Sequence, residues 1–193
     1  MSIERIREHL AQEGEEVVRL RKLSPYGEPM VLKIRYIEAP FTEFGEYACD
    51  VDPKDSFILL DIFAQGENGF HSIGFQDWEV SRGVAKQTVN QHQFVTPQTT
   101  LDELANEAWG NPFNLTAFSV DESYEKNNIG SFLTAIALTV LQAKQVEKLK
   151  GGYITSPGRK TWRRFGVEWK KPLTPVTPVW NHPFIEEILA EFL

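Results

Sequence analysis

The sequence predicts a single α/β (α+β) domain with a central mixed, mostly antiparallel sheet flanked by helices. A length of 193 residues fits one domain, and a hydrophobic content of 41% suffices for a sizeable core. Strand patterns dominate the first half of the chain, and strands alternate with helices in the second half. This succession of elements is typical of a mixed sheet packed against helices.

The first half is expected to contain one helix followed by strands. Residues 2–22 are predicted to be helical because Ile3, Ile6 and Leu10 follow helical spacing. A turn is predicted at 24–29 from its glycine and prolines. The strands expected next are 30–39, 44–51, 56–65 and 70–81. The last two are predicted to form a hairpin across Gly66 and Gly69.

The second half is expected to alternate strands and helices. The predicted elements are a helix at 99–110, a strand at 114–120, a helix from 129 to about 149, a strand at 151–157 and helices at 158–166 and 184–193. We divide the chain into a domain at 1–171 and an extension at 172–193, a proline-rich linker with an amphipathic helix. The apolar face of that helix docks either on this domain or on a second copy, as in a homodimer.

Charge is divided unevenly along the chain. The net charge is −11 over residues 1–143 and +7 over residues 144–171. Such a local basic block on an acidic protein favours an anion site, and a solvated basic surface is the alternative. An RNA-facing patch, with Trp162 available for stacking on bases, is a third and less favoured interpretation.

Several classes of protein are disfavoured. The single Cys49 excludes an internal disulfide, and the four histidines lack the spacing of metal ligands. No apolar run reaches the length of a membrane span, and the charged amino terminus does not resemble a signal peptide. A cytoplasmic protein without a metal site or a membrane partner is therefore expected.

The most informative stretch is "VDESYEKNNIGSFL", residues 120–133. A strand ends at Val120, a polar turn follows, and a long apolar helix begins near Ile129. The free N–H groups at a helix start, together with the helix dipole, favour binding of a phosphate or pyrophosphate. Gly130 leaves room for such a group and Ser131 adds a hydroxyl. An ordinary strand–helix turn would have the same pattern.

This stretch resembles the GNAT superfamily of acyl-CoA-dependent N-acyltransferases. The matching positions are Val120, Asp121, Tyr124, Ile129, Gly130, Ser131 and Leu133. About twenty residues later, "SPGRKTWRRFGVEW" resembles the short helix, aromatic residues and Gly-Phe-Glu block of that family, with Gly166 and Glu168 in place. The resemblance covers roughly residues 112–169.

The resemblance implies transfer of an acyl group from acetyl-CoA or another acyl-CoA to an amine, which attacks the thioester directly. The strand end at Phe118 and Val120 is expected to pair with the pantetheine arm. The pyrophosphate is expected on the turn amides, which belong to Lys126, Asn127, Asn128, Ile129, Gly130 and Ser131. Candidate catalytic groups are Tyr124 and Tyr153, as proton donors, and Glu79, which with Asp77 could deprotonate the amine.

Three residues depart from the family pattern. Glu125 brings a negative charge next to the expected pyrophosphate, and Asn128 replaces a signature glycine. Trp162 stands where many members have the tyrosine that protonates the departing thiolate, and an indole N–H is no practical acid. These departures favour a second hypothesis, a GNAT-like binding or assembly module that has lost its chemistry and does not use CoA.

Overall fold

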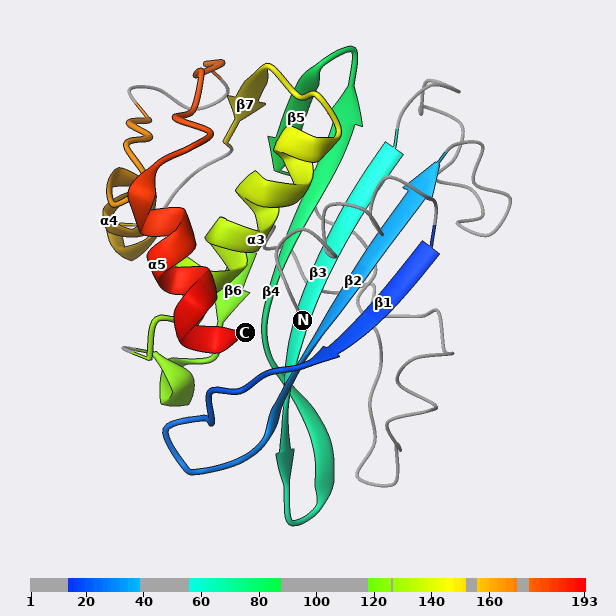
Figure 1. The fold of residues 1–193 in the computed structure, drawn as a ribbon, viewed down its shortest axis with the longest axis vertical. Helices are drawn as coiled ribbons and strands as arrows, with labels where there is room; N and C mark the ends of the chain where they lie inside the picture. Colours follow the sequence, from blue (N-terminus) through cyan, green and yellow to red (C-terminus); the bar gives the residue numbers. More distant parts are fainter. Residues whose placement is uncertain (1–13, 39–55, 88–117, 126, 152–155, 170–173) are drawn as a thin grey trace.

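The computed structural model describes residues 14–38, 56–87, 118–125, 127–151, 156–169 and 174–193. In these ranges the chain forms one seven-stranded mixed sheet with three α-helices against it (Figure 1). The predicted α+β domain with a mixed, mostly antiparallel sheet is therefore confirmed. The strands are β1 (Gly14–Arg19), β2 (Met30–Glu38), β3 (Ser56–Gly66), β4 (Gly69–Ser81), β5 (Val84–Gln87), β6 (Phe118–Val120) and β7 (Lys148–Lys150). The helices are the 3-10 helix η2 (Glu122–Tyr124), α3 (Ile129–Ala143), α4 (Ser156–Arg163) and α5 (Pro183–Phe192).

Strands β1 to β4 form an antiparallel meander, in which β2, β3 and β4 correspond to the strands predicted at 30–39, 56–65 and 70–81. The face toward α3 carries the large apolar side chains of the core, among them Leu32, Leu60 and Trp78. The opposite face carries a fully buried ion pair between Arg35 and Asp61, with a nitrogen–oxygen distance of 3.0 Å. Burial on both faces explains why β3 is an almost continuous apolar run.

One edge of β4 pairs with two strands in succession. β6 pairs with Gly74–Gln76 and β5 pairs with Trp78–Ser81, both antiparallel to β4. β5 and β6 therefore run in the same direction, one beyond the other, and β7 continues the sheet parallel to β5. Among the described strands, β6 pairs with β4 alone. The junction between β5 and β6 is consequently a break along this edge of the sheet.

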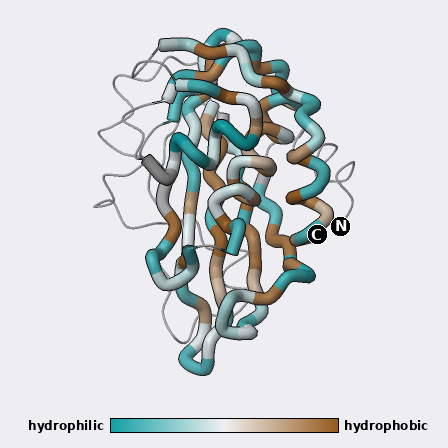
Figure 2. Tube along the Cα trace, turned by 90° about the vertical axis from the view of Figure 1, so that its left-hand side faces the viewer, coloured by the Kyte–Doolittle hydropathy of each residue, from teal (hydrophilic) through white to brown (hydrophobic). Residues whose placement is uncertain are grey.

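Helix α3 is the central helix of the core. Twelve of its 15 residues are buried, because its alanine, leucine and isoleucine side chains are apolar on nearly every side. Figure 2 shows hydrophobic residues along both the strands and the helix layer. The helix ends at Ala143 rather than near 149 as predicted. Gln145 has a left-handed φ of 58°, which stops the helix, and Lys148 already belongs to β7.

The predicted helix at 2–22 is wrong where the structure describes it. Residues 14–19 form β1, in which Val18 faces the core and Val17 faces the other side of the sheet. β-branched valines favour a strand, and pairing with β2 gives them apolar neighbours that helical spacing alone could not reveal. The predicted strand at 44–51, the helix at 99–110, residues 2–13 and most of 151–157 lie outside the described residues.

Helix α5 packs against α3 of its own chain. Phe192 stacks on Phe132 with ring centroids 4.3 Å apart, and Phe184 packs against Phe165. The helix begins as predicted, with His182 accepting a hydrogen bond from the Phe184 N–H and proline at the first position. The predicted apolar face is confirmed, since Ile185, Ile188, Leu189 and Phe192 are buried. Within the described residues, no helix is long and apolar enough to cross a membrane.

Candidate functional site

The turn between β6 and α3 is ordered by its own side chains. The Asp121 carboxylate accepts a hydrogen bond from the Ser123 N–H at 2.8 Å and caps η2. Asn128 has a left-handed φ of 63°, a conformation that asparagine tolerates better than most residues. Its carbonyl accepts the Phe132 N–H at 2.8 Å, which begins the hydrogen bonding of α3. The chain thus turns from β6 and presents the first amides of α3 at this end of the sheet.

Two cationic side chains reach this helix start from distant segments. Arg164, just after α4, donates to the Ser131 hydroxyl at 3.0 Å and to the Asn128 side-chain oxygen at 3.1 Å. Its guanidinium also lies over the Phe184 ring, 4.1 Å from the centroid. Lys22, in the linker between β1 and β2, donates to the Asn127 carbonyl at 2.9 Å. The start of a helix carries a partial positive charge, which repels nearby cations. An anion placed between them offsets this repulsion.

At the start of α3, a carboxylate from α5 lies next to these two cations. Glu191 forms an ion pair with Lys22 and accepts a hydrogen bond from the Asn128 amide at 3.1 Å. Burial alone would raise the pKa of Glu191, but the hydrogen bonds from Lys22 and Asn128 and the nearby Arg164 charge outweigh it and lower the pKa. Lys22 also lies over the Phe192 ring. We call these residues (Lys22, Asn127, Asn128, Ser131, Arg164 and Glu191) the α3-start cluster.

Replacement of Glu191 by glutamine is expected to make the free energy of unfolding depend less on pH in the acidic range. Its pKa is lower in the folded protein than the ordinary value of about 4.3, so the contribution is present above that pH and is lost as the pH falls through the folded pKa. Partly exposed ion pairs contribute up to about 1 kcal/mol. Urea unfolding at pH 7 and at acidic pH should show the wild type losing up to this amount more than Glu191→Gln.

The control is Glu187→Gln, which removes an exposed carboxylate from the same helix. The free energy of unfolding of Glu187→Gln should decrease toward acidic pH as steeply as that of the wild type. Equal acid slopes for the wild type and Glu191→Gln would contradict the role assigned to the Glu191 ion pair.

A second polar cluster, which the sequence did not predict, surrounds Tyr124. The Tyr124 hydroxyl donates to the Glu28 carboxylate at 2.8 Å and lies 2.6 Å from the His71 ring nitrogen. The Ser24 hydroxyl donates to the same carboxylate at 2.9 Å. Burial and the bond to Glu28 raise the pKa of Tyr124 well above its ordinary value. A phenol held in its protonated form is a weaker acid, which disfavours Tyr124 as the proton donor to a thiolate.

The candidate catalytic residues do not meet in the described structure. Glu79 lies on β4, partly buried, with its carboxylate 3.9 Å from the Lys86 amine. His71 lies eight positions earlier on β4, a distance of roughly 26 Å along an extended strand. Asp77 is buried on the same strand. Tyr153 lies outside the described residues, so its role as a proton donor stays a prediction.

The residues predicted to bind the coenzyme follow one another along β6 and the turn into α3. Phe118 and Val120 are in β6, and Ile129 and Ser131 are buried at 1% and 4% exposure. The carbonyl of the partly buried Gly130 accepts the Thr134 hydroxyl at 2.8 Å. Lys126 lies outside the described residues. Sequence reasoning identified this segment, but not its partners Lys22, Arg164 and Glu191.

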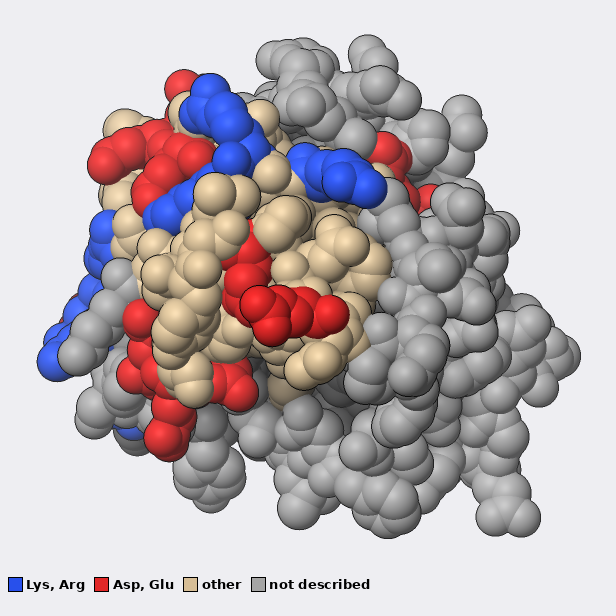
Figure 3. All heavy atoms as spheres, turned by 90° about the horizontal axis from the view of Figure 1, so that it is seen from below, with Lys and Arg blue, Asp and Glu red and all other residues tan. Residues whose placement is uncertain are grey.

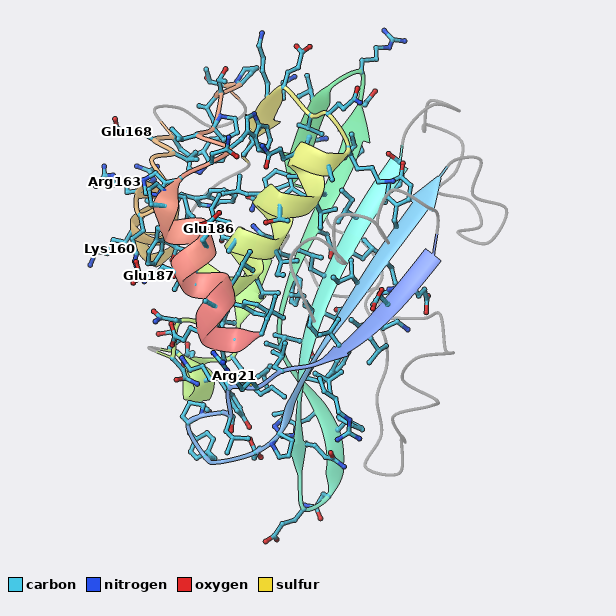
Figure 4. The ribbon with its side chains drawn as sticks, in the orientation of Figure 1. Arg21, Lys160, Arg163, Glu168, Glu186 and Glu187 are labelled. Carbon is cyan, nitrogen blue, oxygen red and sulfur yellow. The ribbon has the colours of Figure 1, made fainter. Side chains whose placement is uncertain are left out.

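The basic residues of α4 and of the turn directly after it divide into two groups. Lys160 and Arg163 point away from the fold (Figure 4), and Arg163 lies 3.8 Å from the Glu168 carboxylate. Arg164 instead turns toward α3. Trp162 between them is 0% exposed and packs between Trp78 and Trp169. The expectation that Trp162 is available for stacking on RNA bases is therefore wrong, because its indole belongs to the core.

At the end of the molecule that carries the turn, acidic and basic side chains both lie among uncharged ones (Figure 3). The exposed carboxylates there include Asp121, Glu122, Glu125 and Glu67. Glu125 is exposed. A carboxylate pointing out into solvent in this way would not face a phosphate on the turn. Arg21 lies beside the carboxyl end of α5 (Figure 4), where it donates to the Ala190 carbonyl.

Comparison of the chain with protein-family models finds no match, and neither does comparison with curated proteins.

Proposed function

We propose that the protein is an acyl-CoA-dependent N-acyltransferase that acts on an amine in the cytoplasm. The observation that carries the proposal is the convergence of Arg164 on Ser131 and Asn128 at the start of α3. This contact places a guanidinium beside helix-start amides, and the two together suit a pyrophosphate. The order β6, turn, α3, β7, α4 also follows the order of elements in the GNAT resemblance.

The open edge of β6 supports the same proposal. β6 uses one edge for β4, and no other described strand pairs with it. An extended pantetheine arm can pair with the free edge of a strand as a peptide does. The thioester carbonyl would then be held for the amine nitrogen, which attacks the carbonyl carbon while the carbon–sulfur bond breaks. Such catalysis depends chiefly on positioning and on polarisation of the carbonyl by a backbone N–H.

The α3-start cluster bears directly on coenzyme binding. Glu191 already neutralises Lys22 at this position, and a pyrophosphate would have to displace or adjoin its carboxylate. Arg164 donates its hydrogen bonds to neutral oxygens and acts on Glu191 only through its nearby charge, so its guanidinium could donate to a phosphate instead. We therefore assign Arg164 the larger role in holding the coenzyme.

A second candidate is a module that keeps the fold without using CoA. The observation in its favour is that the carboxylate of Glu191 lies where the pyrophosphate is expected. The apolar face of α5 is buried on α3, so a homodimer through this helix would use its exposed side, which carries Glu186 and Glu187. The module predicts no binding of CoA at any concentration that the protein tolerates.

Exchange of Arg164 for glutamine is expected to weaken CoA binding by about 10- to 150-fold, since one charge-assisted hydrogen bond contributes about 1.5–3 kcal/mol. The matched control is Arg163→Gln at the last residue of α4, directly before Arg164; its side chain is 63% exposed and points away. Thermal-shift titration with CoA measures both variants. Equal weakening in the two variants would indicate general attraction by charge and would contradict a site at Arg164.

A further inference from the structure

Five buried side chains on the α3 side of the sheet contain polar atoms that lack hydrogen-bond partners. Within the described structure, neither the nitrogen nor the oxygen of the Gln76 amide is bonded, although the residue is 0% exposed. The same holds for the Gln87 amide nitrogen and for the indole nitrogens of Trp78, Trp162 and Trp169.

These five residues are neighbours at the junction between β5 and β6. Gln76 and Trp78 are two residues apart on one face of β4, and Gln87 is the cross-strand partner of Trp78. The Trp162 ring lies 5.8 Å from that of Trp78 and 5.6 Å from that of Trp169. Gln76 itself is opposite Phe118, the first residue of β6. The unpartnered atoms therefore gather where the sheet edge is broken. We call the set the junction cluster.

An apolar core would be more stable without these polar atoms. Buried donors and acceptors nearly always have partners, and a glutamine amide without any carries a desolvation penalty. The perpendicular tryptophan rings allow an indole N–H to face a neighbouring ring, which is a weak substitute for a hydrogen bond. A missing ligand group explains the unsatisfied amide of Gln76 more directly than packing does.

The kinds of atom in the junction cluster indicate the chemistry of that group. Indole nitrogens and amide nitrogens are donors only, so the unpartnered atoms comprise five donor nitrogens and a single acceptor, the Gln76 oxygen. No charged side chain belongs to the set. The complementary group therefore presents neutral acceptor oxygens, as a ketone or amide carbonyl does.

We propose that the junction cluster recognises an acyl chain that carries a carbonyl oxygen beyond the thioester. This inference rests on the proposed acyl-CoA function, because it identifies which acyl group the same coenzyme site prefers. The cluster adjoins Phe118, where the strand predicted to pair with the pantetheine arm begins. Gln76 supplies the amide that donates to the carbonyl, and the tryptophans enclose the chain. These side chains are in contact in the structure, so binding of the acyl group requires them to part.

Acetoacetyl-CoA and butyryl-CoA test the proposal, because their acyl chains have the same length and differ by one carbonyl. Calorimetric titration of the full chain should give about tenfold tighter binding of acetoacetyl-CoA, the effect of one buried hydrogen bond. In Gln76→Met the two thioesters should bind equally. The free variant should also melt about 2–4 °C higher than the wild type, because a misfit polar group has been removed.

Gln142→Met is the matched control, since Gln142 lies on the outer side of α3 and bonds to Asn181. It should leave the preference for acetoacetyl-CoA unchanged. If the wild type binds both thioesters equally, or if Gln76→Met keeps the preference or melts lower, the inference fails while the coenzyme function stands. If the wild type binds neither thioester nor CoA, the proposed function fails and the inference fails with it.

Discussion

Truncation of Trp162 to alanine is expected to lower the free energy of unfolding by about 3–5 kcal/mol. The side chain is fully buried, and its ring contacts Trp78 on the sheet and Trp169 beyond α4 in perpendicular arrangements. Loss of the indole removes the contact that joins α4 to the sheet and leaves a cavity that the rigid strands cannot close. Guanidinium unfolding followed by circular dichroism measures the change.

The control for Trp162 is Trp180→Ala. Trp180 is only partly buried at the edge of the core, so its truncation should cost clearly less. A variant Trp162→Phe should recover part of the lost stability because it keeps an aromatic ring at the site. Equal costs for the two alanine variants would show that Trp162 is not the packing centre that its burial indicates.

Truncation of Phe192 to alanine is expected to cost about 3–5 kcal/mol as well. The ring is 0% exposed and stacks on Phe132 of α3 at an interplanar angle of 7°. It also lies beneath Lys22, so the change removes a cation–π contact at the α3-start cluster. The carboxy-terminal helix would then hold to α3 less tightly, and amide exchange in α5 should become faster than in the sheet.

Val179→Ala serves as the control in the same carboxy-terminal segment. Val179 is 49% exposed, and its truncation should change the free energy of unfolding by less than about 0.5 kcal/mol. If Phe192→Ala also leaves stability and α5 exchange unchanged, the helix does not depend on α3 for its place, contrary to the packing described above.

Local patterns in the sequence predicted much of the fold. The alternation in β2, the apolar run of β3, the glycines of the hairpin and the apolar face of α5 are all local patterns, each depending on neighbours within a few residues. Residues 14–19 were mispredicted because their strand conformation depends on pairing with β2, a tertiary contact. The end of α3 was missed because Gln145 adopts a left-handed conformation that is uncommon for glutamine.

The candidate site was predictable only where it is local. The turn from Asp121 to Ser131 follows from its motif, whereas its partners come from distant segments. Lys22 is 105 residues from Asn127 in sequence, and Glu28 is 96 residues from Tyr124. Periodicity and turn propensity contain no information on such pairs, which arise only when the linker of β1 and β2 folds against the turn. The lowered pKa of Glu191 depends on the same distant contacts.

Calorimetric titration with acetyl-CoA and CoA tests the central claim most directly, with the wild type compared to Gly130→Trp. Gly130 is in the first turn of α3, where an indole would cover the amides proposed to hold the pyrophosphate. We expect the wild type to bind both coenzymes with a micromolar Kd and the variant to lose this binding while remaining folded. Absence of heat and of any thermal shift in the wild type at millimolar coenzyme would contradict the acyltransferase proposal and favour the module.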